Sequence, residues 1–223
     1  MEVLSPLQKE LLNLFGQVAE SGLFYLTGGT ALAAFYLHHR KSYDLDFFTN
    51  EENIILPFAS HLENKLQGKE MKVERRRGFA SFVELTVEKT GETTLIHIAQ
   101  DAPFRLEPPT AKPDFPGIKV DSLIDIASNK LLALFQRATF RDFVDIYFLI
   151  MEKHFTKEKL LALAKEKDPG FELYWLGVAF ERINLFKDEL LETHIIIKPC
   201  KIEDILLFFN HWREEINQEL KRR

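Results

Sequence analysis

Cysteine is nearly absent from this chain. Its 223 residues include one cysteine, Cys200, which excludes an internal disulfide and a zinc site built from cysteines. Secreted scaffolds that depend on disulfides are therefore excluded as a class. A chain without disulfides suits a reducing compartment, and we expect a cytoplasmic protein.

Long apolar runs and a basic leader are also absent. No run approaches the roughly 18 apolar residues that a membrane span needs, and residues 1–5 carry no basic stretch. The sequence therefore predicts no membrane partner. The formal net charge of −5 argues against indiscriminate binding to nucleic acid.

The chain does contain enough apolar residues, 46%, for a sizeable core. Apolar spacing and turn residues predict an α+β protein. Its first half, residues 1–120, alternates helices (6–19, 30–37 and 51–66) with strands (23–26, 43–48, 71–77, 79–88 and 93–99). A proline-rich stretch at 102–116 is a linker or an extended crossing segment. The second half, residues 121–223, is all helical, with helices at 122–136, 142–152, 156–165, 171–184 and 202–221.

A glycine pair ends the first predicted strand. Gly28 and Gly29 lie between an apolar strand and an Ala-rich helix. Unpaired N–H groups and the helix dipole favour an anion at such a point, and glycine lets a phosphate approach the backbone. The Thr30 hydroxyl would add a donor. The same motif also fits an ordinary strand–helix turn, so both interpretations stay open here.

Two carboxylates follow on the next strand. Asp44 and Asp46 are two residues apart, which places both on one face of a strand. Neighbouring carboxylates repel each other unless a cation lies between them, and Mg²⁺ prefers a few carboxylates completed by water and phosphate oxygens. The pair predicts a magnesium site beside the glycine turn. The alternative is a solvated strand end.

These motifs together resemble those of the AbiEii/AbiGii toxin-type nucleotidyltransferases, within the polymerase-β-like superfamily. The resemblance covers about residues 20–150 and rests on three motifs in the same order. They are Gly28-Gly29-Thr30, then Arg40-x-Ser42-x-Asp44-Leu45-Asp46, and then Lys130 with Arg137, Arg141, Asp142 and Asp145. It implies a polymerase-β-like mixed sheet with helices on one face. It also implies a nucleotidyltransferase-like domain at 1–120 and a helical domain at 121–223 that completes the active-site cleft.

The resemblance also assigns roles to residues of the helical half. It implies that Lys130 reaches the nucleotide phosphates, that Arg137 and Arg141 help to bind the nucleotide, and that Asp142 belongs to the active site. From spacing alone, Lys130 and Arg137 share a helix face, and a surface lysine is the alternative for Lys130. Asp142 can cap the next helix. Asp145 can hold Arg137 or Arg141 as a supporting pair.

A third carboxylate of the resembled enzymes is replaced here by His97. A hairpin turn at Thr90-Gly91 would pair Glu84 directly with His97. Glu84 could then orient the ring and raise its pKa, so that the two form a catalytic base. The alternative is a half-buried histidine bonded to a carboxylate without a catalytic role. The replacement of the acid puts the usual two-metal route in question.

The function implied is Mg²⁺-dependent transfer of NMP from an NTP to an RNA, such as a tRNA end, or to a protein. The family implies a toxin with a cognate antitoxin. The basic run Arg75-Arg76-Arg77, together with Arg137 and Arg141, could contact phosphates of the acceptor, while solvated strand edges explain such a run equally well. The alternative function is a nucleotide- or partner-binding module that kept the fold and lost turnover.

Overall fold

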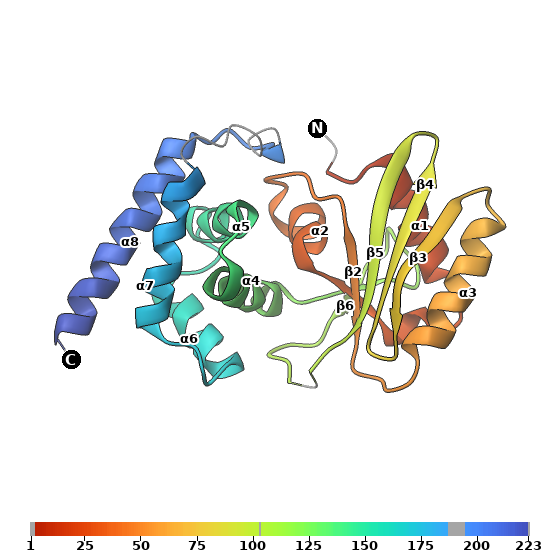
Figure 1. The fold of residues 1–223 in the computed structure, drawn as a ribbon, viewed down its shortest axis with the longest axis horizontal. Coiled ribbons are helices and arrows are strands. Elements are labelled where there is room, and N and C mark those ends of the chain that lie inside the picture. The colour runs from red at the N-terminus through yellow and green to blue at the C-terminus, as the bar shows by residue number, and fades with distance from the viewer. Residues whose placement is uncertain (1–2, 103, 187–194, 223) are drawn as a thin grey trace. The chain divides into compact units, whose positions relative to one another are not determined.

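The computed structural model describes residues 3–102, 104–186 and 195–222. The chain divides into two compact units (Figure 1). Unit 1 comprises residues 1–36 and 41–123, and unit 2 comprises residues 37–40 and 124–223. The short segment 37–40 thus belongs with the helical part of the chain, although it lies early in the sequence.

Unit 1 is built on a mixed seven-stranded sheet of order β3-β4-β5-β2-β1-β7-β6. Strands β2 and β5 run parallel, as do β1 and β7, and the other neighbours are antiparallel. The strands are β1 (Tyr25–Thr27), β2 (Leu45–Thr49), β3 (Lys72–Phe79), β4 (Phe82–Lys89), β5 (Glu92–Gln100), β6 (Thr110–Ala111) and β7 (Lys119–Val120). The predicted α+β class with a mixed sheet is confirmed.

The helices of unit 1 are α1 (Pro6–Gly16), α2 (Gly28–Leu32) and α3 (Ile55–Gln67), with a π-helical turn at Ala33–Leu37 after α2. Helix α1 begins as predicted, with Ser5 as the N-cap, Pro6 at the first helical position, and a capping box formed by Ser5 and Gln8. Helix α3 starts at Ile55 rather than at residue 51. The reason is that residues 52 and 53 form a turn in which Asn53 has φ of +61°, a conformation outside the right-handed helical region.

One face of the sheet packs on α1 and α3 through aromatic side chains. Phe15 of α1 stacks on Phe47 of β2 with ring centroids 3.6 Å apart, and Phe58 of α3 contacts both Phe15 and Phe24. Because strand side chains alternate between faces, burying Phe47 directs Asp46 to the opposite face. The aromatic core thus fixes which face of the sheet carries the carboxylate.

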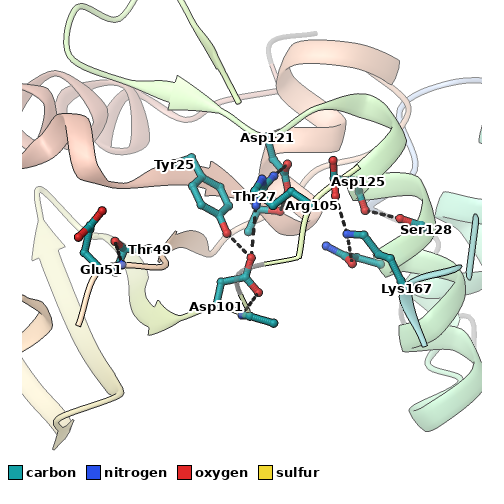
Figure 2. Close-up of polar contacts among 12 residues, drawn as sticks. Tyr25, Thr27, Thr49, Glu51, Asp101, Arg105, Asp121, Asp125, Ser128 and Lys167 are labelled. Atoms are coloured by element: carbon teal, nitrogen blue, oxygen red, sulfur yellow. Dashed lines mark hydrogen bonds and ion pairs between the residues drawn. The ribbon is translucent and has the colours of Figure 1, made fainter. Parts of the chain in front are cut away.

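The proline-rich stretch belongs to unit 1, which selects the crossing segment over the linker. Its β6 pairs with β7, and Arg105 is held between Asp101 and Asp121 (Figure 2). The Arg105 guanidinium also lies over the Tyr25 ring, 4.1 Å from its centroid. Burial and the Asp101 carboxylate raise the pKa of Tyr25 far above its ordinary value.

Unit 2 is a helical bundle. Its helices are α4 (Leu123–Arg137), α5 (Phe140–Met151), α6 (Lys157–Lys167), α7 (Leu173–Glu181) and α8 (Ile202–Arg222). Phe143, Phe180, Phe209 and Trp212 form its aromatic core. None of the helices described combines the length and apolar composition that crossing a bilayer requires.

Candidate functional site

The glycine turn at the end of β1 makes room for a carboxylate. Gly28 has φ of +72°, and a Cβ added to it would lie 2.3 Å from Oδ2 of Asp46. A side chain at this position would therefore collide with Asp46 and strain the backbone. The structure thus gives a reason for the glycine that the sequence did not suggest, because the Asp46 carboxylate lies where a Cβ would be. The phosphate contact stays a prediction.

Helix α2 begins without a side-chain cap. Thr27 precedes it, but the Thr27 hydroxyl donates to Asp121 at 2.7 Å. Uncapped N–H groups at the start of a helix attract anions. The Thr30 hydroxyl, predicted as a further phosphate donor, instead donates its single proton to the Asp44 carbonyl. Thr30 is fully buried, so its hydroxyl supports the loop that carries Asp44.

Asp44 and Asp46 lie at the beginning of β2, both half-buried. Asp44 precedes the strand, which begins at Leu45, so only Asp46 is a strand residue. This corrects the expectation that both carboxylates are on the strand. The alternation of burial nevertheless continues through Asp44, Asp46 and Phe48, with the residues between them buried.

His97 lies directly beside Asp46. The parallel pairing of β2 with β5 places Asp46 opposite His97, and the hairpin places Glu84 opposite His97, as predicted. The His97 Nδ1 atom is 2.8 Å from Asp46 Oδ1, and Nε2 is 3.6 Å from Glu84 Oε2. The three residues therefore form a row across β4, β5 and β2.

The charge on His97 is controlled mainly by Asp46. The hydrogen bond to Asp46 raises the pKa of His97, with further contributions from the Asp44 and Glu84 carboxylates, and this outweighs the lowering by burial. From the sequence, the raised pKa of His97 was attributed to Glu84. That assignment was incomplete, because the β2–β5 pairing joins segments far apart in the chain and leaves no local signal.

The predicted magnesium site can be tested against these donors. Within the described ranges, no group of three or more His, Cys, Asp or Glu side chains is arranged to hold a metal ion. Mg²⁺ is commonly held by only one or two carboxylates, with water and substrate phosphates completing its shell. Asp44 and Asp46, both half-exposed, fit that kind of open site.

Unit 2 contains a buried ionic cluster around Asp145. Arg40 binds both oxygens of Asp145, at 2.6 and 2.9 Å, His39 contacts Asp145 Oδ1 at 2.7 Å, and Lys130 contacts Oδ2 at 2.8 Å. Asp145 is fully buried, and Lys130 and Arg40 are nearly so. Lys130 is therefore not the surface lysine that the sequence left open as an alternative.

Asp142 forms the other half of this cluster. Arg137 binds both of its oxygens at 2.9 Å, Lys130 lies 3.9 Å away, and the Thr139 hydroxyl donates to it at 2.6 Å. Asp142 thus supports the start of α5 from the third position of a capping box, with Thr139 as the capping residue. Arg137 and Lys130 meet at one carboxylate, as expected for residues on a shared helix face.

The partner predicted for Asp145 was wrong. Arg137 pairs with Asp142, and Arg141 is exposed and forms no ion pair within the described residues. Burial alone would raise the pKa of both carboxyls. The guanidinium of Arg40 and the ammonium of Lys130 instead hold the pKa of Asp145 well below its ordinary value, and Arg137 and Lys130 lower that of Asp142.

His39 and Arg40 were missed as site residues. Arg40 entered only as part of a quoted motif, yet both side chains are buried on Asp145. Burial lowers the pKa of His39 despite the carboxylate beside it, so His39 is neutral near pH 7. The only available signal was the Arg40-x-Ser42 element of the motif, since a partner 105 residues away gives no local pattern.

Comparison with known proteins agrees with these observations. Residues 10–222 match the model of the family described as nucleotidyl transferase AbiEii toxin, type IV toxin–antitoxin system. The uncharacterized protein aq_aa25 of Aquifex aeolicus (strain VF5) is 28% identical over 228 residues, covering 97% of this chain and 95% of the relative.

Two solved structures from Helicobacter pylori share the fold. One is a candidate nucleotidyltransferase with a TM-score of 0.64 and 20% identity, where the match covers 98% of both chains. The other is JHP933, with a TM-score of 0.61 and 19% identity, covering 96% of this chain and 92% of that one. At these identities the likeness concerns the fold.

Proposed function

Because the chain belongs to the AbiEii nucleotidyl transferase toxin family of type IV toxin–antitoxin systems, we propose that it transfers a nucleotidyl group from an NTP to an acceptor hydroxyl. The acceptor oxygen forms a bond to the α-phosphorus, the bond from that phosphorus to the bridging oxygen breaks, and pyrophosphate leaves. The acceptor proton passes to solvent. The reaction is placed in the cytoplasm, where NTP is present.

The observation that carries this proposal is the position of Asp46. Its carboxylate lies against Gly28, at the uncapped start of α2, on the face of the sheet opposite Phe47. A carboxylate beside an anion-attracting turn is an arrangement that can hold a cation and phosphates together. We assign Asp44 and Asp46 to a divalent cation, and the N–H groups of Gly28 and Gly29 to the phosphates. The cation would neutralise the phosphates as pyrophosphate leaves.

The cluster of unit 2 supports a phosphate-binding role for Lys130 and Arg137. Arg40, Lys130 and Arg137 bring three cations to the two carboxylates Asp142 and Asp145. Side chains of this kind are the ones that bind phosphate oxygens in proteins. Arg137, whose side chain is 60% exposed, can reach one without leaving the cluster. Arg141, also exposed, is kept as a proposed nucleotide contact on the family resemblance alone.

We propose RNA, such as a tRNA end, as the acceptor, and a cognate antitoxin as the biological partner. The basic run on β3 supports RNA only in part. Arg75 is bound by Glu63 and Ser60, and Arg76 by Glu74. A protein hydroxyl is the alternative acceptor, and the net charge of −5 is compatible with it.

A second candidate function is nucleotide binding without turnover. The observation that favours it is His97, which lies where the resembled enzymes carry an acid. An imidazole paired with Asp46 leaves the usual two-metal arrangement incomplete. Binding and turnover must therefore be measured separately.

The test is Mg²⁺-dependent incorporation of each labelled NTP into total RNA and into total protein. We expect incorporation by the native chain, none by Asp46→Ala, and full incorporation by Asp114→Ala, which removes an exposed carboxylate of the same unit. Binding of NTP and metal without incorporation would select the second function. Equal incorporation by Asp46→Ala and the native chain would refute the assignment of the site.

A further inference from the structure

The proposed magnesium site has a nitrogen atom, Nδ1 of His97, beside the carboxylate of Asp46, whereas Mg²⁺ takes oxygen ligands. Asp46 and His97 are direct partners on β2 and β5, and Nδ1 lies 2.8 Å from Oδ1. Both side chains are partly open, with 21% of His97 and 27% of Asp46 exposed. The pair is therefore not sealed from solvent.

The short contact between Nδ1 and Oδ1 requires a proton or a cation between the two atoms. An imidazole lone pair and a carboxylate oxygen repel each other, so a proton joins them in the hydrogen bond described here. A divalent cation can take the place of that proton. Two ligands at right angles, each about 2.1 Å from a cation, are about 3.0 Å apart, which is close to the 2.8 Å separation of Nδ1 and Oδ1.

Glu84 faces the ring nitrogen that keeps its proton when a cation takes the place of the proton at Nδ1. Its Oε2 atom is 3.6 Å from Nε2 of His97, longer than a hydrogen bond. With the proton at Nε2, the lone pair is at Nδ1, facing Asp46. Carboxylates in this position behind a histidine commonly orient it toward a metal and strengthen its binding.

We propose that His97 Nδ1 and Asp46 Oδ1 bind the divalent cation together, so that the site prefers a first-row transition ion, such as Fe²⁺ or Zn²⁺, to Mg²⁺. This inference rests on the proposed function, because it concerns the same cation. Mg²⁺ is a hard ion that takes oxygen ligands, whereas an imidazole ligand suits Zn²⁺, Fe²⁺ and Ni²⁺, and Mn²⁺, which also accepts oxygen ligands, serves as the paramagnetic probe of the same site. His97, in the position of the third acid, would thus change which cation the site prefers, and the site would still bind a cation.

The test uses the full chain, Mn²⁺, and α,β-methylene UTP, whose phosphate bridge contains no nitrogen. Pulsed electron paramagnetic resonance reports whether ¹⁴N is bound to the ion, and it is recorded from about pH 7 to about pH 9 because Asp46 raises the pKa of His97. We expect a ¹⁴N coupling in the native chain. His97→Asp should abolish it and shift the ratio of Mn²⁺ to Mg²⁺ affinity toward Mg²⁺ by at least about tenfold.

The control is His61→Gln, which removes a histidine of the same unit that is 60% exposed, and it should keep the coupling. Because His97→Asp retains an ion-binding side chain, cation binding by this variant also verifies that its site is folded. Mn²⁺ bound without ¹⁴N coupling in the native chain would overturn this inference and leave the proposed function standing. Absence of any Mn²⁺ or Mg²⁺ binding, with or without nucleotide, would overturn both.

Discussion

At the scale of single residues, Gly28 and Asp46 depend on each other. Gly28→Ala should both strain a positive-φ backbone and push the Asp46 carboxylate away. We expect a loss in the free energy of unfolding of about 1–3 kcal/mol beyond the strain alone, together with weaker binding of the divalent cation. Urea unfolding and calorimetric metal titration measure the two effects.

Gly91→Ala is the matched control for that substitution. Gly91 has φ of +83° but nothing within 4 Å of an added Cβ, so it reports the backbone strain alone, about 1 kcal/mol. Equal losses in the two variants, with metal binding intact, would show that Gly28 and Asp46 do not constrain each other.

The buried carboxylate of Asp145 should dominate the stability of unit 2. Asp145→Asn removes the buried carboxylate that contacts both Arg40 and Lys130 and should cost about 3–5 kcal/mol of unfolding free energy. Glu88→Gln, which breaks an exposed pair with Lys72, should change it by less than about 1 kcal/mol. Denaturant titrations of the native protein and the two variants measure these free energies of unfolding. Similar losses in Asp145→Asn and Glu88→Gln would contradict the prediction.

The same carboxylate predicts an acid response. The pKa of Asp145 is lower in the folded than in the unfolded chain, so its stabilising effect is complete above about pH 4 and is lost as the pH falls through the folded-state pKa. The melting temperature of the native protein should therefore drop below about pH 4. In Asp145→Asn that drop should be smaller, and an equal drop in both proteins would contradict the assignment.

At the scale of elements, the β4–β5 hairpin sets the register of the site. Thr90 and Gly91 both have positive φ, a conformation that suits Asn-Gly and is poor for a β-branched residue. Thr90→Asn should raise the free energy of unfolding by about 0.5–1 kcal/mol and leave the pairing of Glu84 with His97 unchanged. Thermal unfolding measures the first and backbone NMR the second. Destabilisation would show that the Thr90 side chain has a role that the turn geometry does not reveal.

The hairpin also shows what local sequence can predict. Its turn and register followed from residues within a few positions of each other, so Glu84 could be placed against His97 in advance. The contact of His97 with Asp46 could not be, because it depends on a parallel pairing between distant segments. The start of α3 was misplaced for a different reason, since a turn at residues 52 and 53, with Asn53 at φ +61°, precedes the helix.

At the scale of the whole molecule, the chain passes between its two units after residues 36, 40 and 123. The short excursion at 37–40 supplies Arg40 to the carboxylate cluster of α4 and α5. The sequence placed Lys130 and Asp142 in a common motif, but it gave no reason to bury His39 and Arg40 beside them. Burial of charge is decided by pairing across the fold, and local composition does not report it.

This excursion makes unit 2 depend on a residue far away in sequence. Arg40→Gln should increase amide hydrogen exchange across α4 and α5, because Asp145 loses its bidentate partner. His38→Asn, at an exposed position of the same segment, should not. Mass spectrometry of deuterium uptake compares them, and unchanged exchange in Arg40→Gln would mean that Lys130 alone neutralises Asp145.

The aromatic core of unit 2 has a spectroscopic consequence. Both tryptophans of the chain, Trp175 and Trp212, lie in that unit. Trp212 is 2% exposed within the phenylalanine cluster and Trp175 is 55% exposed, so acrylamide should quench the long-wavelength part of the emission first. Unit 1 contributes no indole fluorescence. A change in tryptophan emission on adding nucleotide would therefore be a direct signal that the helical unit responds.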